Sequence, residues 1–348
     1  MSHEIRTPMN AITGMAELLL RKKELSDESR GYAKDINQAS ANLIHIINDI
    51  LDLSKIEAGK LEIIPVKYML SSLINDTVSI IRMRLIEKPI RFFTNIDSQI
   101  PNELFGDEIR LRQILLNILS NAVKYTDKGH ISISINEKTR KEEQVWLEIV
   151  VADTGKGVKP EDLEKLFGEF AQVDTKKNRG IEGTGLGLAI TKRLCLAMGG
   201  DIRVKSEYGK GSTFTAIIPQ GIHMDVPFAA VNEPEKKNVL VFERRTVYGE
   251  SISWSLNNMK VPHILVNNED ALAEALFREE WAFLFLGYGL YNKIKPLMEK
   301  PDTNFVGGKK PSLVLMLEWE TETYIPNPRS QIPSPRLFQA SIQNKVLP

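Results

Sequence analysis

Two apolar stripes with helical spacing open the chain and constrain its fold more than any other feature. A polar stretch from Lys22 to Ser29 separates them, and Ala58-Gly59 ends the second. Two narrow seams cannot both be buried in a lone hairpin, so we expect residues 1–62 to form a four-helix bundle from two chains. The stripes consist of Ile5, Met9, Ile12, Ala16 and Leu19, then Tyr32, Ile36, Ala39, Leu43, Ile46, Ile50 and Leu53.

Strand and helix patterns alternate over residues 65–220 and predict one α/β domain with a mixed sheet. The expected helices span 69–88, 107–124 and 185–198, and the expected strands 90–96, 131–135, 145–152, 202–206 and 213–218. Residues 221–236 contain prolines and charges and predict a linker. Residues 237–348 again alternate short buried strands with helices, which predicts a doubly wound parallel sheet.

The charge balance and the cysteine content narrow the class of protein. Lys plus Arg and Asp plus Glu each total 45, so no basic excess exists for nucleic acid or an anionic membrane surface. Cys195 is the single cysteine and cannot form an intrachain disulfide, as in a reducing cytosol. No apolar run is long enough to span a bilayer, and no signal peptide is recognisable. We therefore expect a cytoplasmic protein without membrane or nucleic-acid contact.

The segment from Ser2 to Pro8 carries a candidate nucleophile. His3 lies off the apolar stripe, so its imidazole is expected to face solvent, with Glu4 beside it and Thr7 one turn further along. Pro8 removes a backbone hydrogen bond and bends the helix there. A neighbouring carboxylate fixes the imidazole tautomer and takes up its proton, which favours nucleophilic attack. A surface histidine on a coiled coil is the alternative.

A second group of polar residues lies on one expected helix. Asn117 and Asn121 are four residues apart and Lys124 follows three later, so all three can face one pocket. Amide oxygens suit a Mg²⁺ ion that keeps several waters, which makes Asn121 a candidate metal ligand. The alternative is the polar side of an amphipathic helix, but asparagine is a poor helix former.

Two glycine-containing segments indicate a nucleotide site. Residues 153–157 begin with Asp153 directly after an expected strand, and its carboxylate can accept a hydrogen bond from the adenine amine. Residues 183–188 place glycines at a helix start, where backbone amides can approach phosphate. A polar stretch precedes them instead of a strand, so a mobile lid fits better than a Rossmann turn. Arg179 in that lid is the candidate to neutralise the γ-phosphate, and a solvated charge run is the alternative.

In their order, these segments resemble the phosphoacceptor box and the N, G1 and G2 boxes of histidine kinases. Residues 52–60 resemble the dimerisation helix of that family, residues 166–170 stand at the F box, and residues 209–214 resemble the final glycine box. The resemblance covers residues 1 to about 220. It implies the ATP-binding sandwich shared with gyrase, Hsp90-type chaperones and mismatch-repair ATPases.

The resemblance implies a homodimeric protein-histidine kinase that uses ATP and Mg²⁺, cytoplasmic itself or the cytoplasmic part of a membrane-bound kinase. His3 would attack the γ-phosphoryl group with Glu4 as base, and an aspartate on the receiver domain of a separate response regulator would receive it. Thr7 matches the position that orients water for the reverse, phosphatase reaction. Asn121 would bind the metal and Asp153 the adenine. The implied nucleotide-binding residues are Asn117, Asn121, Lys124, Tyr125, Asp153, Gly155, Gly157, Phe170, Arg179, Gly183, Thr184, Gly185, Leu186, Gly187 and Thr213.

Residues 237–348 resemble a receiver domain in length and strand order but lack its reactive groups. A working receiver has an acidic pair after its first strand, an aspartate after its third and a lysine before a late proline. Glu243-Arg244, Gly287 and Ile332 stand at these places. We expect a degenerate receiver-like module that regulates or docks and that neither binds Mg²⁺ tightly nor accepts phosphate. An unrelated α/β fold is the alternative.

Two other functions compete with the kinase. A chaperone or topoisomerase-type ATPase of the same superfamily is disfavoured, because those proteins lack the histidine helix. A nucleotide-binding dimeric scaffold without kinase activity is the other alternative, because only two residues precede His3 and the helix upstream of it is expected to be absent.

Overall fold

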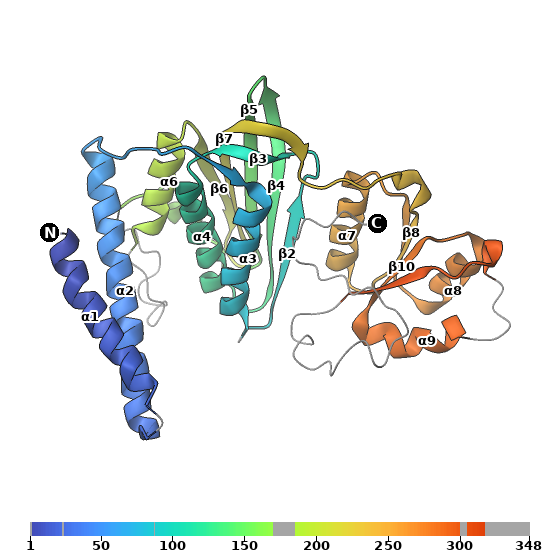
Figure 1. Ribbon diagram of the computed structural model, residues 1–348, viewed down its shortest axis with the longest axis horizontal. Helices are drawn as coiled ribbons and strands as arrows, with labels where there is room; N and C mark the ends of the chain where they lie inside the picture. Colours follow the sequence, from blue (N-terminus) through green and yellow to red (C-terminus); the bar gives the residue numbers. More distant parts are fainter. Residues whose placement is uncertain (1, 23, 87, 170–184, 300–304, 317–348) are drawn as a thin grey trace.

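The computed structural model describes residues 2–22, 24–86, 88–169, 185–299 and 305–316. These form a helical hairpin, a central α/β domain and a smaller α/β domain, arranged in a row (Figure 1). No helix in the described ranges is both long and apolar enough to cross a lipid bilayer.

The hairpin consists of α1 (Ser2–Leu20) and α2 (Asp27–Glu57), which pack against each other as the stripes predict. Ser26 begins α2 as its N-cap and accepts a 3.2 Å hydrogen bond from the amide of Ser29. The helix ends at the predicted place, where Gly59 adopts a φ of +64°. The hairpin thus has the two expected helices with defined ends.

Much of the apolar stripe remains uncovered within one chain. Met9 and Ala16 are buried between the helices, at 8% and 2% exposure. Other apolar side chains of the hairpin are between 40% and 66% exposed: Ile12, Met15, Leu18, Leu19, Tyr32, Ile36, Leu43 and Ile50. An apolar surface of this extent on two helices is typical of a protein–protein contact.

The central domain contains one mixed sheet of seven strands among the described residues. Its order is β1-β3-β7-β5-β4-β2, with β6 also paired to β7, and only the β2–β4 pair is parallel. The strands are β1 (Val66–Met69), β2 (Ile90–Ile96), β3 (Pro101–Gly106), β4 (Gly129–Lys141), β5 (Gln144–Asp153), β6 (Asp201–Glu207) and β7 (Gly211–Pro227). The mixed sheet confirms the α/β prediction for this part of the chain.

Three helices cover one face of this sheet: α3 (Leu70–Leu85), α4 (Glu108–Tyr125) and α6 (Gly187–Ala197) (Figure 1). A short helix, α5 (Pro160–Leu163), follows β5. Alternate residues of the strands meet one side of each helix in a single apolar core. Lys88 donates hydrogen bonds to the carbonyls of Val123 and Thr126, at 2.6 and 3.2 Å, and so satisfies the C-terminus of α4.

The sheet is larger than the sequence pattern predicts. Strands β1 and β3 were not expected, and β7 continues to Pro227, into the range 221–236 expected as a linker. The added part of β7 pairs with β3, where Pro227 lies opposite Pro101. The linker therefore begins later than predicted.

The smaller domain has a parallel sheet of four strands in the described residues, ordered β11-β10-β8-β9. Helix α7 packs on one face, whereas α8 and α9 contribute to the apolar cluster on the other. Its elements are β8 (Val239–Phe242), α7 (Thr246–Asn258), β9 (His263–Val266), α8 (Glu269–Arg278), β10 (Phe283–Gly287), α9 (Tyr291–Glu299) and β11 (Ser312–Met316). The predicted parallel, doubly wound arrangement is present in this range.

Candidate nucleotide-binding site

Helix α4 presents the predicted asparagines and lysine on its half-buried side. Asn117, Asn121 and Lys124 are all partly exposed, and their spacing places them on one side of the helix. The Asn117 amide donates to the Gly187 carbonyl and to the Thr191 hydroxyl, each at 3.3 Å. Asn117 therefore fixes α4 against the first turn of α6, which brings two predicted parts of the site together.

Asp153 lies at the end of β5 and is only 9% exposed. Its Oδ1 accepts a 2.8 Å hydrogen bond from the amide of Gly155. Burial raises the pKa of Asp153 above its usual value, and hydrogen bonds from the backbone of Gly155 and Ser212 act in the opposite direction. A carboxylate buried at this position gains from any further donor that a ligand brings.

The loop after Asp153 has room only for glycine at two positions. A Cβ on Gly155 would lie 2.4 Å from the Tyr125 carbonyl oxygen and 2.8 Å from Asp153 Oδ1. Gly157 has a φ of +64°, and a Cβ there would lie 2.1 Å from the carbonyl oxygen of Glu207. The two glycines thus let the loop approach α4 and β6 closely.

Thr126 belongs to this site, although the sequence pattern did not indicate it. Its hydroxyl is fully buried, and in the described part of the chain it is the one buried side-chain oxygen or nitrogen without a hydrogen-bond partner. It would lie 2.9 Å from a Cβ on Gly155, in the loop that follows Asp153. An unpaired buried hydroxyl costs about 1–3 kcal/mol. A buried carboxylate acceptor, an unpaired hydroxyl and a glycine-only loop fit a polar, planar ligand such as adenine.

The start of α6 has the backbone form that the sequence predicts for a phosphate site. Gly185 has a φ of +71°, Leu186 is 1% exposed, and α6 begins at Gly187 without a side-chain N-cap. Unpaired amides at a helix N-terminus favour an anion. Thr213 lies on β7 opposite Ala152 of β5. Phe170, Arg179, Gly183 and Thr184 lie outside the described residues.

The phosphoacceptor segment lies in the first turns of α1. The backbone of His3 and Glu4 is helical, but their side chains are outside the described part of the structure. Thr7 is exposed and Pro8 lies within the helix, as predicted. The predicted contact between His3 and Glu4 therefore stays a prediction.

Two acidic residues of α2 join the hairpin to the central domain, and neither was predicted to do so. Asp52 of α2 accepts hydrogen bonds from Arg110, at 3.2 Å, and from Gln113, at 2.9 Å. Glu57, at the end of α2, lies 3.5 Å from Arg193 of α6. The end of α2 is thus attached to both helices that border the candidate site.

In the smaller domain, Glu243 and Gly287 lie close together, but Arg244 does not face them. Glu243 follows β8 and is 4% exposed, and a Cβ on Gly287 would lie 3.8 Å from its carboxylate. Arg244 turns away and pairs with Glu269 at the surface. Arg245 instead donates to both carboxylate oxygens of Glu243, each at 2.8 Å.

The sheet with its three helices, the Asp153 loop and the glycine start of α6 define an ATP-binding domain of the class shared by histidine kinases and gyrase. Residues 106–222 match the family model described as "Histidine kinase-, DNA gyrase B-, and HSP90-like ATPase". Residues 1–59 match "His Kinase A (phospho-acceptor) domain". These two domains are those of sensor histidine kinases, the family to which the chain belongs.

Known proteins of the same class are similar over different parts of the chain. Hybrid signal transduction histidine kinase B of Dictyostelium discoideum is 42% identical over 64% of this chain and 11% of its own length. Sensor protein GacS of Pseudomonas syringae pv. syringae is 38% identical over 78% of this chain and 30% of its own. The chain thus spans less than a third of the length of either relative.

A solved structure covers more of the fold. Full-length ShkA in complex with AMPPNP superposes with a TM-score of 0.71 at 27% identity. The match covers 93% of this chain and 64% of ShkA. It therefore extends beyond the two domains that match family models.

Proposed function

We propose that this chain is an ATP-dependent kinase that phosphorylates its own His3. The observation that carries the proposal is the buried Asp153, with the adjacent unpaired Thr126 hydroxyl, in an ATPase-type domain joined directly to a phosphoacceptor hairpin. Asp153 accepts a hydrogen bond from the adenine amine, and the glycine start of α6 binds the phosphates.

The His3 imidazole attacks the γ-phosphorus, a nitrogen–phosphorus bond forms, and the bond to the β-phosphate oxygen breaks so that ADP leaves. Glu4 accepts the imidazole proton. Asn121 would hold Mg²⁺ through its amide oxygen, and the ion would supply positive charge to the phosphates. Arg179 is assigned to the γ-phosphate on the resemblance alone.

The phosphoryl group then passes to an aspartate on the receiver domain of a response regulator. Thr7, which is exposed on α1, orients a water for the reverse, phosphatase reaction. The exposed apolar seam of the hairpin supports a homodimer, because burying it within one chain would need further helices.

We assign the smaller domain as a receiver-like module without receiver chemistry. The strand order β9-β8-β10-β11 corresponds to the start of the 2-1-3-4-5 order of flavodoxin-like sheets. At the end of β10, Gly287 offers no nucleophile, and Arg245 holds Glu243 in the way that a divalent cation would. Ile332 lies outside the described residues.

The test of the kinase proposal is incubation of the chain with γ-labelled ATP and Mg²⁺. A phosphohistidine is labile in acid and stable in alkali, so label with both properties is expected. Label that is stable in acid, or no label while nucleotide still binds, would contradict the proposal.

A further inference from the structure

Helix α7 of the smaller domain lies along β2, the outer strand of the central sheet (Figure 1). Alternate residues of β2 share one face, and they meet residues of α7 that recur at helical spacing. The rings of Phe93 and Tyr248 pack edge to face at 4.7 Å, and Ser251 donates a 2.6 Å hydrogen bond to Asn95. Phe93 is 6% exposed but belongs to none of the apolar cores, and the Tyr248 ring contributes to its burial.

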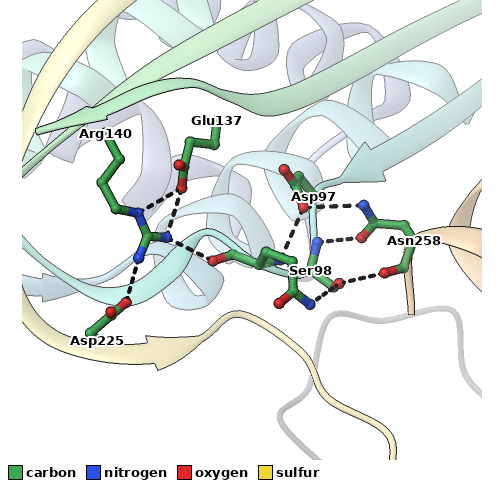
Figure 2. A network of polar contacts seen from close by, with 7 residues as sticks. Asp97, Ser98, Glu137, Arg140, Asp225 and Asn258 are labelled. Carbon is green, nitrogen blue, oxygen red and sulfur yellow. Dashed lines mark hydrogen bonds and ion pairs between the residues drawn. The ribbon is translucent and has the colours of Figure 1, made fainter. Parts of the chain in front are cut away.

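The C-terminal end of α7 is held by hydrogen bonds to the loop after β2. Asn258 donates to Asp97 at 3.1 Å and accepts from the backbone amide of Ser98 (Figure 2). Arg140 braces the same loop, because it donates to the backbone carbonyl of Gln99 at 3.0 Å. Helix α7 is therefore attached to the central domain both through Tyr248 and Ser251 and, at its C-terminal end, through Asn258.

The N-terminal end of α7 is held from within the smaller domain. Arg245 donates to both oxygens of the buried Glu243, and its guanidinium lies 3.9 Å from the centre of the Tyr248 ring. Burial alone would raise the pKa of Glu243, but the hydrogen bonds from Arg245 bring it below its usual value. The Glu243–Arg245 pair is thus ionised at neutral pH and fixes one side of the Tyr248 ring without a metal or a phosphate.

On the side of the central domain, the contact continues to the Asp153 loop. Phe93 packs edge to face on His130 at 5.8 Å. The His130 amide donates to the Thr154 hydroxyl at 2.9 Å, and its carbonyl accepts from the Thr154 amide at 3.1 Å. Thr154 directly follows Asp153, so packed or hydrogen-bonded residues connect Tyr248 with the adenine carboxylate.

We propose that Tyr248 is a positioning residue for nucleotide binding: it holds Phe93 and His130 in place and thereby fixes the Thr154 end of the Asp153 loop. The role of Asp153 in this inference rests on the proposed function. The receiver-like module then acts on ATP affinity through packing, and it does so independently of its own phosphorylation.

The experiment compares Tyr248→Ala, Tyr248→Phe and unmodified protein, all as the full chain. The dissociation constant of a fluorescent ATP analogue and the hydrogen exchange of residues 91–97, 129–131 and 153–157 are measured. Tyr248→Ala is expected to raise the dissociation constant roughly three- to tenfold and to accelerate exchange in all three segments. Tyr248→Phe keeps the ring and should restore both values.

Asn258 offers a matched test at the other end of α7. Asn258→Ala removes the hydrogen bonds that its side chain makes with Asp97 and Ser98, so it should weaken nucleotide binding in the same direction. Asn257→Ala, at an exposed position of the same helix, is the control and should change neither measurement.

An unchanged dissociation constant in Tyr248→Ala overturns the positioning role, whether or not β2 exchanges faster. A loss that Tyr248→Phe does not restore overturns it too. Asp153→Ala separates this result from the proposed function, because unchanged nucleotide binding in that variant means that the adenine site itself is misassigned.

Discussion

The Asp153 carboxylate accepts a 2.8 Å hydrogen bond from the amide of Gly155, two residues further along the same loop. The acid that we assign to adenine is therefore oriented before any nucleotide arrives. This bond uses one oxygen and leaves capacity for a donor from the ligand.

Replacement of Asp153 should cost more ATP affinity than any other single change in the pocket. We expect Asp153→Ala to weaken ATP binding by roughly one to two orders of magnitude, because a hydrogen bond to a charged group is lost. Competition between ATP and GTP is the sharper measurement, since only adenine presents an amine there. A variant that still prefers ATP over GTP as strongly as the unmodified protein would contradict the assignment.

The same residue predicts a trade-off between stability and function. Burial raises the pKa of Asp153, so the native state holds this proton more tightly than the unfolded chain does. The stability that this group contributes is present below the unfolded pKa and is lost as the pH rises through the raised native pKa. Asp153→Asn should therefore raise the melting temperature at neutral pH, and the gain should shrink towards about pH 4. A lower melting temperature at pH 7 would be the opposite result.

His3→Ala should reduce autophosphorylation to background. The ATP affinity should stay within about twofold, because α1 and the nucleotide pocket lie in different domains. His223→Ala is the matched control, since His223 is an exposed histidine near the end of β7. Acid-labile label that persists in His3→Ala would move the phosphoacceptor elsewhere.

Asn121→Ala should weaken ATP binding only when Mg²⁺ is present. The amide oxygen of Asn121 is the proposed metal ligand, so its removal should have no effect in excess EDTA. Calorimetric titrations with ATP under both conditions measure the difference. An equal loss in EDTA would exclude a metal role and leave a direct contact with the nucleotide.

The exposed seam of the hairpin predicts which substitutions separate the dimer. Leu18 is 64% exposed on α1, and Leu18→Glu would place a charge in the interface of the proposed four-helix bundle. Analytical ultracentrifugation should show a dimer for the unmodified chain and a dissociation constant raised at least about tenfold for Leu18→Glu. Met83→Glu, at an exposed position on α3, serves as the control and should remain dimeric. If the unmodified chain is monomeric at micromolar concentration, the predicted homodimer is wrong.

The sequence predicted the secondary structure best where residues that form turns bound a segment clearly. β2 was expected at 90–96 and spans those residues, because its isoleucines and phenylalanines lie between a proline and an aspartate. β1 and β3 lacked such a signal, since each is short and mixes polar with apolar residues. The extension of β7 was missed for the same reason: its last five residues are exposed and read as a loop.

The local motifs of the site were readable, but its long-range partners were not. Asp153 and its glycines form one contiguous segment, whereas Thr126 joins the pocket only because α4 ends beside it. In the smaller domain, the partner of Glu243 is Arg245 and not the adjacent Arg244, which the sequence could not show either. Two adjacent arginines follow Glu243, and only the fold decides which of them turns inward.

Strand β7 also determines where the chain can be divided. Its 17 residues extend over roughly 55 Å, from Gly211 beside the Asp153 end of β5 to Pro227 beside β3. After β7, the amides of Phe228 and Ala229 donate hydrogen bonds to the loop between β2 and β3, which Asn258 also contacts. A fragment that ends at residue 220 would lack the part of β7 that pairs with β3 and would leave β3 with β1 alone, so an isolated catalytic domain should extend to at least residue 229.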